Sequence, residues 1–225
     1  MSRARHGRVA AHRQVLRHLH ERGLGCVCWA IVVAFVPSAP LRAQGANPQR
    51  EDLRAELLQL QKDDQADRAG LAAAVSRNDT VYLRRLQESD SRREARLKAI
   101  VALEGWPSVA KVGRDGVEAA WMILQHATDT AWQANMLPIL EGAAEAGEVR
   151  RSEVALLTDR VLVRSGRPQR YGSAFSIVDG RLVADPIDDE EHVDARRAAV
   201  GLPPMADYAK LLSELNGLPV EWPRK

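Results

Sequence analysis

Apolar residues recur at helical spacing over most of the chain. In residues 50–74 the leucines fall on one stripe with charged residues between them, which predicts an amphipathic helix. A second helix is predicted over 79–103, with Asp79 as its N-cap and Gly105 just past its end. Residues 87–96 within it are nearly all polar and mostly charged, which fits either a solvated helix face or a loop.

The stretch 115–127 is apolar almost all round. At about 100° per residue its apolar side chains cover more than one face, and Glu118 and Gln125 form the one clear polar strip. A helix of this kind is usually surrounded by other elements. We therefore expect it to be the central helix of the core.

Further helices follow this central one. The spacing of Thr130 and Gln133 matches a capping box at the start of a helix that runs to Ala146 and is kinked by Pro138. Ser152 is a suitable N-cap for the next helix. The remaining predicted helices span 153–164, 188–200 and 205–215.

The apolar period changes to that of a strand near residue 171. Two short strands, 171–178 and 181–184, flank Asp179-Gly180, which is a strong signal for a two-residue hairpin turn. Residues 218–225 carry no helical pattern and are read as a tail. The pattern thus predicts a mainly α fold: a compact multi-helix single domain over 50–217, with one small β-hairpin near residues 171–184.

The first 43 residues have the order of a secretory signal peptide. Six arginines lie in residues 3–22, an apolar run follows from Leu24 to Val36, and a small residue, Ala43, ends the segment. The apolar run is 13 residues long, which is short for a membrane-spanning helix. We therefore expect cleavage near Ala43, a polar tether over 44–49, no stable membrane span after cleavage, and a secreted or periplasmic domain.

Removal of this leader changes the composition. Without its seven arginines and one glutamate the chain keeps 25 basic and 29 acidic residues, so its net charge becomes −4 in place of +2. That charge does not favour nucleic acid as a partner. Cys26 and Cys28 are also lost, and His126 and His192 are the histidines that remain. We therefore expect no disulfide, no metal site and no cofactor.

Several short islands occur in a recognisable order over roughly residues 53–208. They are Gly105-Trp106-Pro107, Gln125-His126, Leu157-Thr158-Asp159-Arg160, Gln169-Arg170-Tyr171-Gly172, Pro186-Ile187-Asp188 and Arg196-Arg197 leading to Gly201-Leu202. With these islands, the chain resembles an uncharacterised bacterial domain-of-unknown-function family, found in many secreted or envelope-associated proteins. The resemblance implies the fold and export, and it implies no activity.

His126 is the first candidate for chemistry, because it ends the most apolar helix. As a catalytic residue it would be a general acid or base, with Asp129 or Asp159 fixing its tautomer. The alternative is a histidine favoured by the helix dipole and bonded to a carbonyl. Asp159 and Arg160 are adjacent among apolar residues, so one of them faces inward, either to line a pocket or to form a structural ion pair.

The remaining candidates would bind a ligand. Gln169 and Tyr171 precede the hairpin, where a loop can present an amide and a phenol, although Tyr171 can equally pack on the helices. Asp188 begins an acidic run that suits a helix start. Arg196 and Arg197 suit a helix end, or an anion site together with Arg160.

Two functions from different classes follow, and neither has a recognised motif behind it. The first is a domain that binds a small molecule, a peptide or an envelope protein without chemistry. The second is a hydrolase in which His126 activates water and an aspartate orients it. A scaffold in an envelope assembly is a third possibility, which would expose a large apolar patch.

Export predicts a definite amino terminus for the native protein. Mass spectrometry of material isolated from the cell envelope or the medium should find a chain that begins near Gln44. An intact terminus at Met1 in a cytoplasmic fraction would contradict export.

Overall fold

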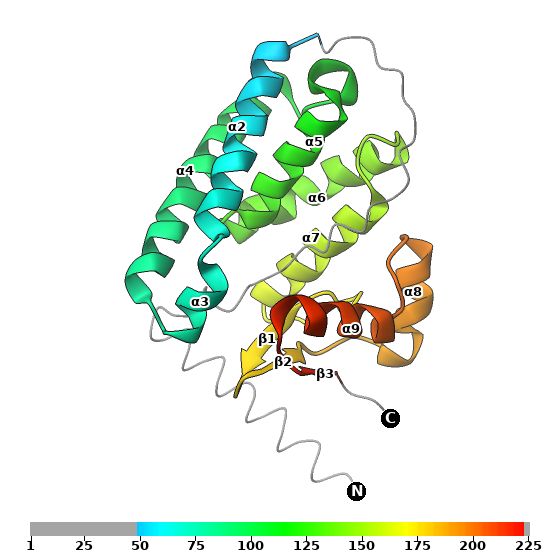
Figure 1. Ribbon diagram of the computed structural model, residues 1–225. Helices are drawn as coiled ribbons and strands as arrows, with labels where there is room; N and C mark the ends of the chain where they lie inside the picture. Colours follow the sequence, from blue (N-terminus) through cyan, green and yellow to red (C-terminus); the bar gives the residue numbers. More distant parts are fainter. Residues whose placement is uncertain (1–48, 223–225) are drawn as a thin grey trace, which may run out of the picture. The chain divides into compact units, whose positions relative to one another are not determined.

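Helices make up most of residues 49–222, the part of the chain that the computed structural model describes (Figure 1). The predicted signal peptide lies outside the described residues, as do residues 44–48 of the tether and 223–225 of the tail. The mainly α, compact domain that the apolar pattern predicts is confirmed. The helices are α2 (Glu51–Arg68), α3 (Leu71–Ser76), α4 (Thr80–Glu104), α5 (Val109–His126), α6 (Thr130–Glu145), α7 (Arg151–Arg164), α8 (Val193–Ala199) and α9 (Met205–Asn216).

Local signals account for several helix ends. Asp79 caps α4 as predicted, because its side chain accepts a hydrogen bond from the backbone N–H of Tyr82. The single helix expected over 50–74 is instead two, α2 and α3, with a break at Gly70. Tyr82 explains the glycine there, because a Cβ on Gly70 would lie 3.3 Å from its ring. The tyrosine of α4 thus packs closely against the break.

Two predicted caps are wrong. Asp129, and not Thr130, caps α6 by accepting from the N–H of Trp132. Gln133 does not complete a capping box, because its amide donates to the carbonyls that end α5. Likewise α7 starts without a cap from Ser152, since Glu153 accepts from the backbone N–H of Arg150. In both cases tertiary contacts or a neighbouring acid outweigh the spacing rule.

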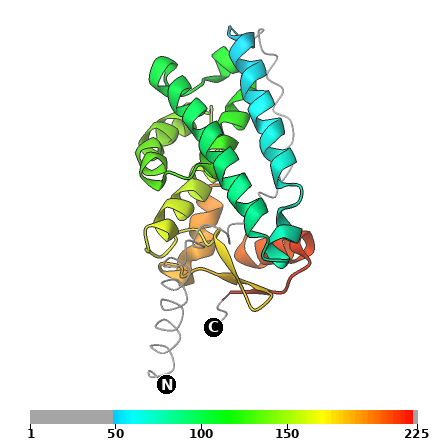
Figure 2. The same ribbon diagram turned by 90° about the vertical axis from the view of Figure 1, so that its left-hand side faces the viewer.

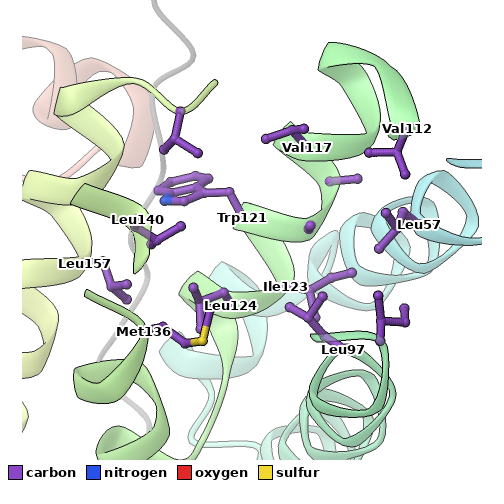
Figure 3. Packing of buried hydrophobic residues seen from close by; sticks show 14 of the residues in the cluster. Leu57, Leu97, Val112, Val117, Trp121, Ile123, Leu124, Met136, Leu140 and Leu157 are labelled. Atoms are coloured by element: carbon purple, nitrogen blue, oxygen red, sulfur yellow. The ribbon is translucent and has the colours of Figure 1, made fainter. Parts of the chain in front are cut away.

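The central helix is α5, as its apolar pattern predicts. Nine of its residues are buried, and it packs against both α2 and α4, which lie side by side (Figure 2). It begins earlier than expected, at Val109, with a kink at Gly113, where φ is 73°. In Figure 3 Trp121 projects from α5 toward the side of the core where Leu140 and Leu157 lie. Its indole N–H also donates to the carbonyl of Glu153 on α7, at 3.3 Å.

The charged stretch 87–96 is helical and only partly solvated. Asp90, Arg93 and Glu94 are buried in α4, so neither a loop nor a wholly solvated face describes this segment. Buried charges need partners. Those partners come from α2 and from the loop before α6, which no periodicity in α4 could show.

The predicted hairpin is confirmed, although its first strand begins at Phe175 and not at Tyr171. Strands β1 (Phe175–Val178) and β2 (Arg181–Ala184) pair antiparallel around Asp179 and Gly180, whose φ angles of 49° and 73° suit a tight hairpin turn. A third strand, β3 (Val220–Glu221), pairs parallel with β2 within the stretch read as a tail. Leu218, Val220 and Trp222 pack against a second apolar cluster, which explains why this segment is ordered. The cluster comprises Phe175, Leu182, Ala184, Val193, Met205, Tyr208 and Leu212.

The helix expected over 188–200 is shorter than predicted. A 3-10 turn, η1 (Glu190–His192), precedes α8, and Asp189 before it adopts a left-handed conformation with φ of 43°. Within residues 49–222, none of the helices combines the length and the apolar character that a bilayer crossing requires.

Two glycines with positive φ give a matched test of packing. Gly172 (φ 69°) leaves no room for a side chain, because a Cβ would lie 2.6 Å from Sδ of Met205, whereas nothing lies within 4 Å at Gly166 (φ 71°). Gly166→Ala should cost about 1–2 kcal/mol of unfolding free energy from backbone strain. Gly172→Ala should cost about 2–5 kcal/mol, because overpacking adds to the strain. Urea denaturation measures both, and equal losses would contradict the close packing at Gly172.

Candidate functional site

His126 ends α5 with its ring against a carboxylate of α2. Its Nδ1 lies 3.0 and 2.9 Å from the two carboxylate oxygens of Asp64, which is fully buried. The expected partners, Asp129 and Asp159, make other contacts. The prediction that Asp129 or Asp159 orients the ring is therefore wrong. The alternative of a helix-end histidine is wrong about its hydrogen-bond partner, which is a carboxylate and not a carbonyl. A tautomer-fixing carboxylate is nevertheless present.

Asp64 is surrounded by cations as well. Arg68, one turn further along α2, places Nη1 3.1 Å from the carboxylate, and Nε of Arg93 on α4 lies 3.5 Å away. Both guanidinium groups also bind Asp90, and Arg93 reaches Asp67 at 2.7 Å. This chain of ion pairs joins α2 to α4 and compensates the buried charge of Asp64.

The surroundings of the pair determine its protonation. Burial lowers the pKa of His126 below its ordinary value of 6.5, and the positive charges of Arg68 and Arg160 lower it further, against the opposing effect of Asp64. Burial would raise the pKa of Asp64, but His126 and the two arginines outweigh it and hold that pKa below 3.8. The result at neutral pH is a neutral imidazole whose Nδ1–H donates to an ionised carboxylate.

The loop after α5 is held in place from α4. Glu94 accepts hydrogen bonds from the backbone N–H of Thr128 at 2.7 Å, from its hydroxyl at 2.8 Å and from the N–H of Asp129 at 3.1 Å. Lys98 bridges Glu94 and Asp129 at 2.6 and 2.7 Å. These contacts fix the end of α5 and with it the position of His126.

Asp159, the other residue proposed as catalytic, forms its hydrogen bonds with the loop before the hairpin and not with His126. Its fully buried carboxylate accepts from the backbone N–H groups of Arg170 (2.7 Å), Tyr171 (2.9 Å) and Ser173 (2.9 Å), and from the Ser173 hydroxyl (2.8 Å). Burial raises the pKa of Asp159, and these hydrogen bonds oppose that shift. Asp159 therefore holds the loop before the hairpin.

Gln169 holds the same loop from within. Its amide donates to the carbonyls of Ala174 (2.9 Å) and Asp185 (2.8 Å) and accepts from the N–H of Ala174 (2.7 Å). Its backbone carbonyl accepts from the N–H of Asp188, which is exposed. The amide that was expected to face a ligand is thus engaged in the fold.

The two adjacent arginines bind backbone carbonyls of this loop. Arg197 donates to Tyr171 and to Pro203, both at 2.6 Å, and its guanidinium lies 4.7 Å from the centre of the Tyr208 ring. Arg196 donates to the carbonyl of Arg170 at 2.9 Å. Neither forms an anion site with Arg160 in the described contacts. Burial lowers the pKa of Arg197.

The predicted residues therefore fall into two groups. The larger group meets at the loop 169–174 and includes the backbone of Asp188. Its side chains belong to Asp159, Gln169, Tyr171, Arg196 and Arg197. His126 belongs to the other group, and the charge of the buried Arg160 acts on its ring. The second group also holds residues that the sequence did not single out, Asp64, Arg68 and Arg93. Their one local signal is the i,i+4 spacing of Asp64 and Arg68.

Chemically, the His126 group can accept or transfer a proton, and the loop group stabilises the fold. Within residues 49–222 no cluster of three or more His, Cys, Asp or Glu side chains is placed to hold a metal ion. A family model described as a family of unknown function (DUF6624) matches residues 51–221. Comparisons with curated proteins and with solved structures gave no significant match.

The lowered pKa of His126 predicts how stability depends on pH. The unfolded chain binds a proton near 6.5 that the folded chain binds only at lower pH, so the free energy of unfolding should fall as the pH drops through about 6.5 and be retained above it. Urea denaturation from about pH 7.5 to 5.5 should show this loss. His126→Asn should reduce it, because asparagine does not titrate.

His192 provides the control for this experiment. Asp189 raises the pKa of His192, so that histidine favours the folded state on the acid side and works in the opposite direction. His192→Asn should leave the acid loss of stability in place. An undiminished loss in His126→Asn would show that another group causes it.

Proposed function

The chain belongs to DUF6624, a family of unknown function, and we propose that its domain binds a small molecule or a peptide through the imidazole of His126. One observation carries the proposal: Nδ1 is held by Asp64, while Nε2 has no hydrogen-bond partner among residues 49–222. The side chain of His126 keeps 11% of its surface exposed. Its second nitrogen is thus the part of the ring left for a ligand.

The carboxylate defines what that nitrogen can do. With the proton on Nδ1, Nε2 carries a lone pair and accepts a hydrogen bond from an N–H or O–H of the ligand. Because the ring is largely buried, such a bond gains strength from the low local dielectric. The ion pairs behind Asp64 keep the carboxylate ionised and the tautomer constant.

Hydrolysis is the second candidate, and the same carboxylate favours it. A neutral imidazole oriented by a buried aspartate can take a proton from water as the water oxygen attacks a carbonyl carbon, and then return it to the leaving group. The nearby charge of Arg160 would stabilise the negative oxygen of that intermediate. In this version Asp64 replaces Asp159 as the orienting residue.

Export remains part of the proposal, on the strength of the arginine-rich and then apolar order of residues 1–43. An exported domain meets ligands of the envelope or the medium. These include small metabolites, peptides and envelope proteins, and they form the library in which a ligand should be sought.

A thermal-shift screen of such compounds tests binding. The sharpest variant is His126→Asn, whose amide can still donate to Asp64 but which lacks Nε2, and His192→Asn is its matched control. A ligand should stabilise the wild-type protein and the control, and His126→Asn should bind it about 2–10-fold more weakly for the loss of one hydrogen bond. A ligand that stabilises all three proteins equally would clear His126 of a binding role.

An ester and amide hydrolysis panel separates the second candidate from the first. If His126 is the general base, Asp64→Asn and His126→Asn should each lower kcat by about 100-fold or more. Circular dichroism confirms that the variants are folded. Turnover that persists in both folded variants would contradict a catalytic role.

A further inference from the structure

Asp90 of α4 holds two arginines that lie beside the carboxylate of Asp64. Arg68 donates three hydrogen bonds to Asp90, at 3.0, 3.0 and 2.9 Å, and Arg93 donates one at 2.9 Å. The side chain of Asp90 lies where α2 and α4 run side by side (Figure 2), and it is 11% exposed. One carboxylate therefore binds both guanidinium groups.

Within the described part of the chain, neither arginine donates a hydrogen bond to Asp64, although both are close to it. Nη1 of Arg68 lies 3.1 Å from Oδ1 of Asp64. Nε of Arg93 lies 3.5 Å from the same oxygen, and this nitrogen has no hydrogen-bond partner. Nδ1 of His126 is 3.0 and 2.9 Å from the two oxygens of Asp64. The arginines thus compensate the charge of Asp64 and leave its oxygens accessible to the imidazole.

A guanidinium released from Asp90 would compete with the imidazole for Asp64. Its fork of N–H groups matches a carboxylate, and two charge-assisted hydrogen bonds outweigh a single one from a neutral ring. Arg68 is the closer competitor, because it lies one helical turn from Asp64 on the same face of α2. Its hydrogen bonds to Asp90 oppose such a capture.

We propose that Asp90 is a positioning residue, which binds the two guanidinium groups and thereby keeps Asp64 for the imidazole of His126. This inference rests on the function proposed above, because Nε2 is an acceptor for a ligand or for water only while the ring proton stays on Nδ1. Asp90 acts on the ring through Asp64 and the arginines. It is therefore not a catalytic residue.

Two other groups act on the same pair from α2 and α7. Gln65 donates to Oδ2 of Asp64 at 3.1 Å. The positive charge of Arg160 on α7 lowers the pKa of His126. A change at Asp90 leaves both residues in place, so any response of the ring to that change comes from α4 and the two arginines.

The charge balance of this group offers a matched pair of variants. Three acids, Asp64, Asp67 and Asp90, face two arginines, Arg68 and Arg93. Asp67 binds Arg93 at 2.7 Å from a more exposed position, at 41%. Asp90→Asn and Asp67→Asn each leave two acids against two arginines, which favours folding of both variants. Of the two, Asp90→Asn is the variant that releases Arg68.

Nitrogen NMR of the imidazole shows which ring nitrogen carries the proton. At about pH 8, where the lowered pKa leaves the ring neutral, wild-type His126 should carry it on Nδ1. In Asp90→Asn the ratio of the two tautomers should shift at least about tenfold toward Nε2–H, because the ring loses its bond to a charged acceptor. Asp67→Asn should keep the wild-type tautomer, since Asp90 still holds both arginines.

A double variant, Asp90→Asn with Arg68→Gln, tests the competition directly. It lacks the guanidinium that would capture Asp64, and its net charge in this group equals that of the wild type. The two amides can also form a hydrogen bond with each other. The double variant should therefore return the ring proton to Nδ1. Circular dichroism confirms that each variant is folded.

Four results would overturn the assignment. A wild-type ring with its proton on Nε2 would show that Asp64 is not reserved for it, and this measurement needs no variant. An unchanged tautomer in folded Asp90→Asn, or an equal shift in Asp67→Asn, would make Asp90 a structural charge alone. A double variant that keeps the shifted tautomer would exclude competition by Arg68.

These measurements use the ring without a ligand, so their failure differs from a failure of the proposed function. If Asp90 has no effect on the tautomer, a ligand that depends on His126 in the thermal-shift screen would still support binding. A screen without such a ligand would end the binding function, whatever tautomer the ring adopts.

Discussion

The fold depends above all on one buried carboxylate, which accepts the hydrogen bonds that the backbone of a loop would otherwise donate to water. Asp159 of α7 accepts hydrogen bonds from three backbone N–H groups and a hydroxyl of residues 170–173, and a buried N–H group needs such a partner. The carbonyl side of the same loop is satisfied by Arg197 and Tyr208, at 2.6 and 3.4 Å. Gly172 allows this because its positive φ turns the chain tightly beside Met205. Helix α7 is thereby tied to the segment that leads into the β-hairpin.

A second buried carboxylate, Asp64, is stabilised in a different way. Cations and an imidazole surround it, where neutral N–H groups surround Asp159. A carboxylate whose hydrogen-bonding capacity is filled by backbone groups can only hold them in place. A carboxylate that binds one nitrogen of an imidazole leaves the other nitrogen available for a partner. This difference separates the residue that supports the fold from the pair on which the proposed function rests.

The sequence islands gain a physical explanation from these contacts. Four of the islands meet at the loop 169–174 through hydrogen bonds. They are the islands around Asp159, Gln169–Gly172, Pro186–Asp188 and Arg196–Arg197. Polar residues in a loop therefore signalled a structural junction here, although the same signal often accompanies a binding site. The island that contains Gln125 and His126 lies outside this junction, and in it the Gln125 amide has no hydrogen-bond partner among residues 49–222 and His126 is partly exposed.

The sequence by itself determined the elements whose causes are local. Apolar periodicity located the helices and made α5 central, Asp79 began α4, and Asp179-Gly180 placed the hairpin turn. Only the tertiary structure decided which charges are buried and which residues meet. Asp64 and His126 are 62 positions apart, and the acidic run around Asp64 looks solvated until α4 and α5 cover it. Burial and partner choice depend on neighbours distant in sequence, and no periodicity along one helix carries that information.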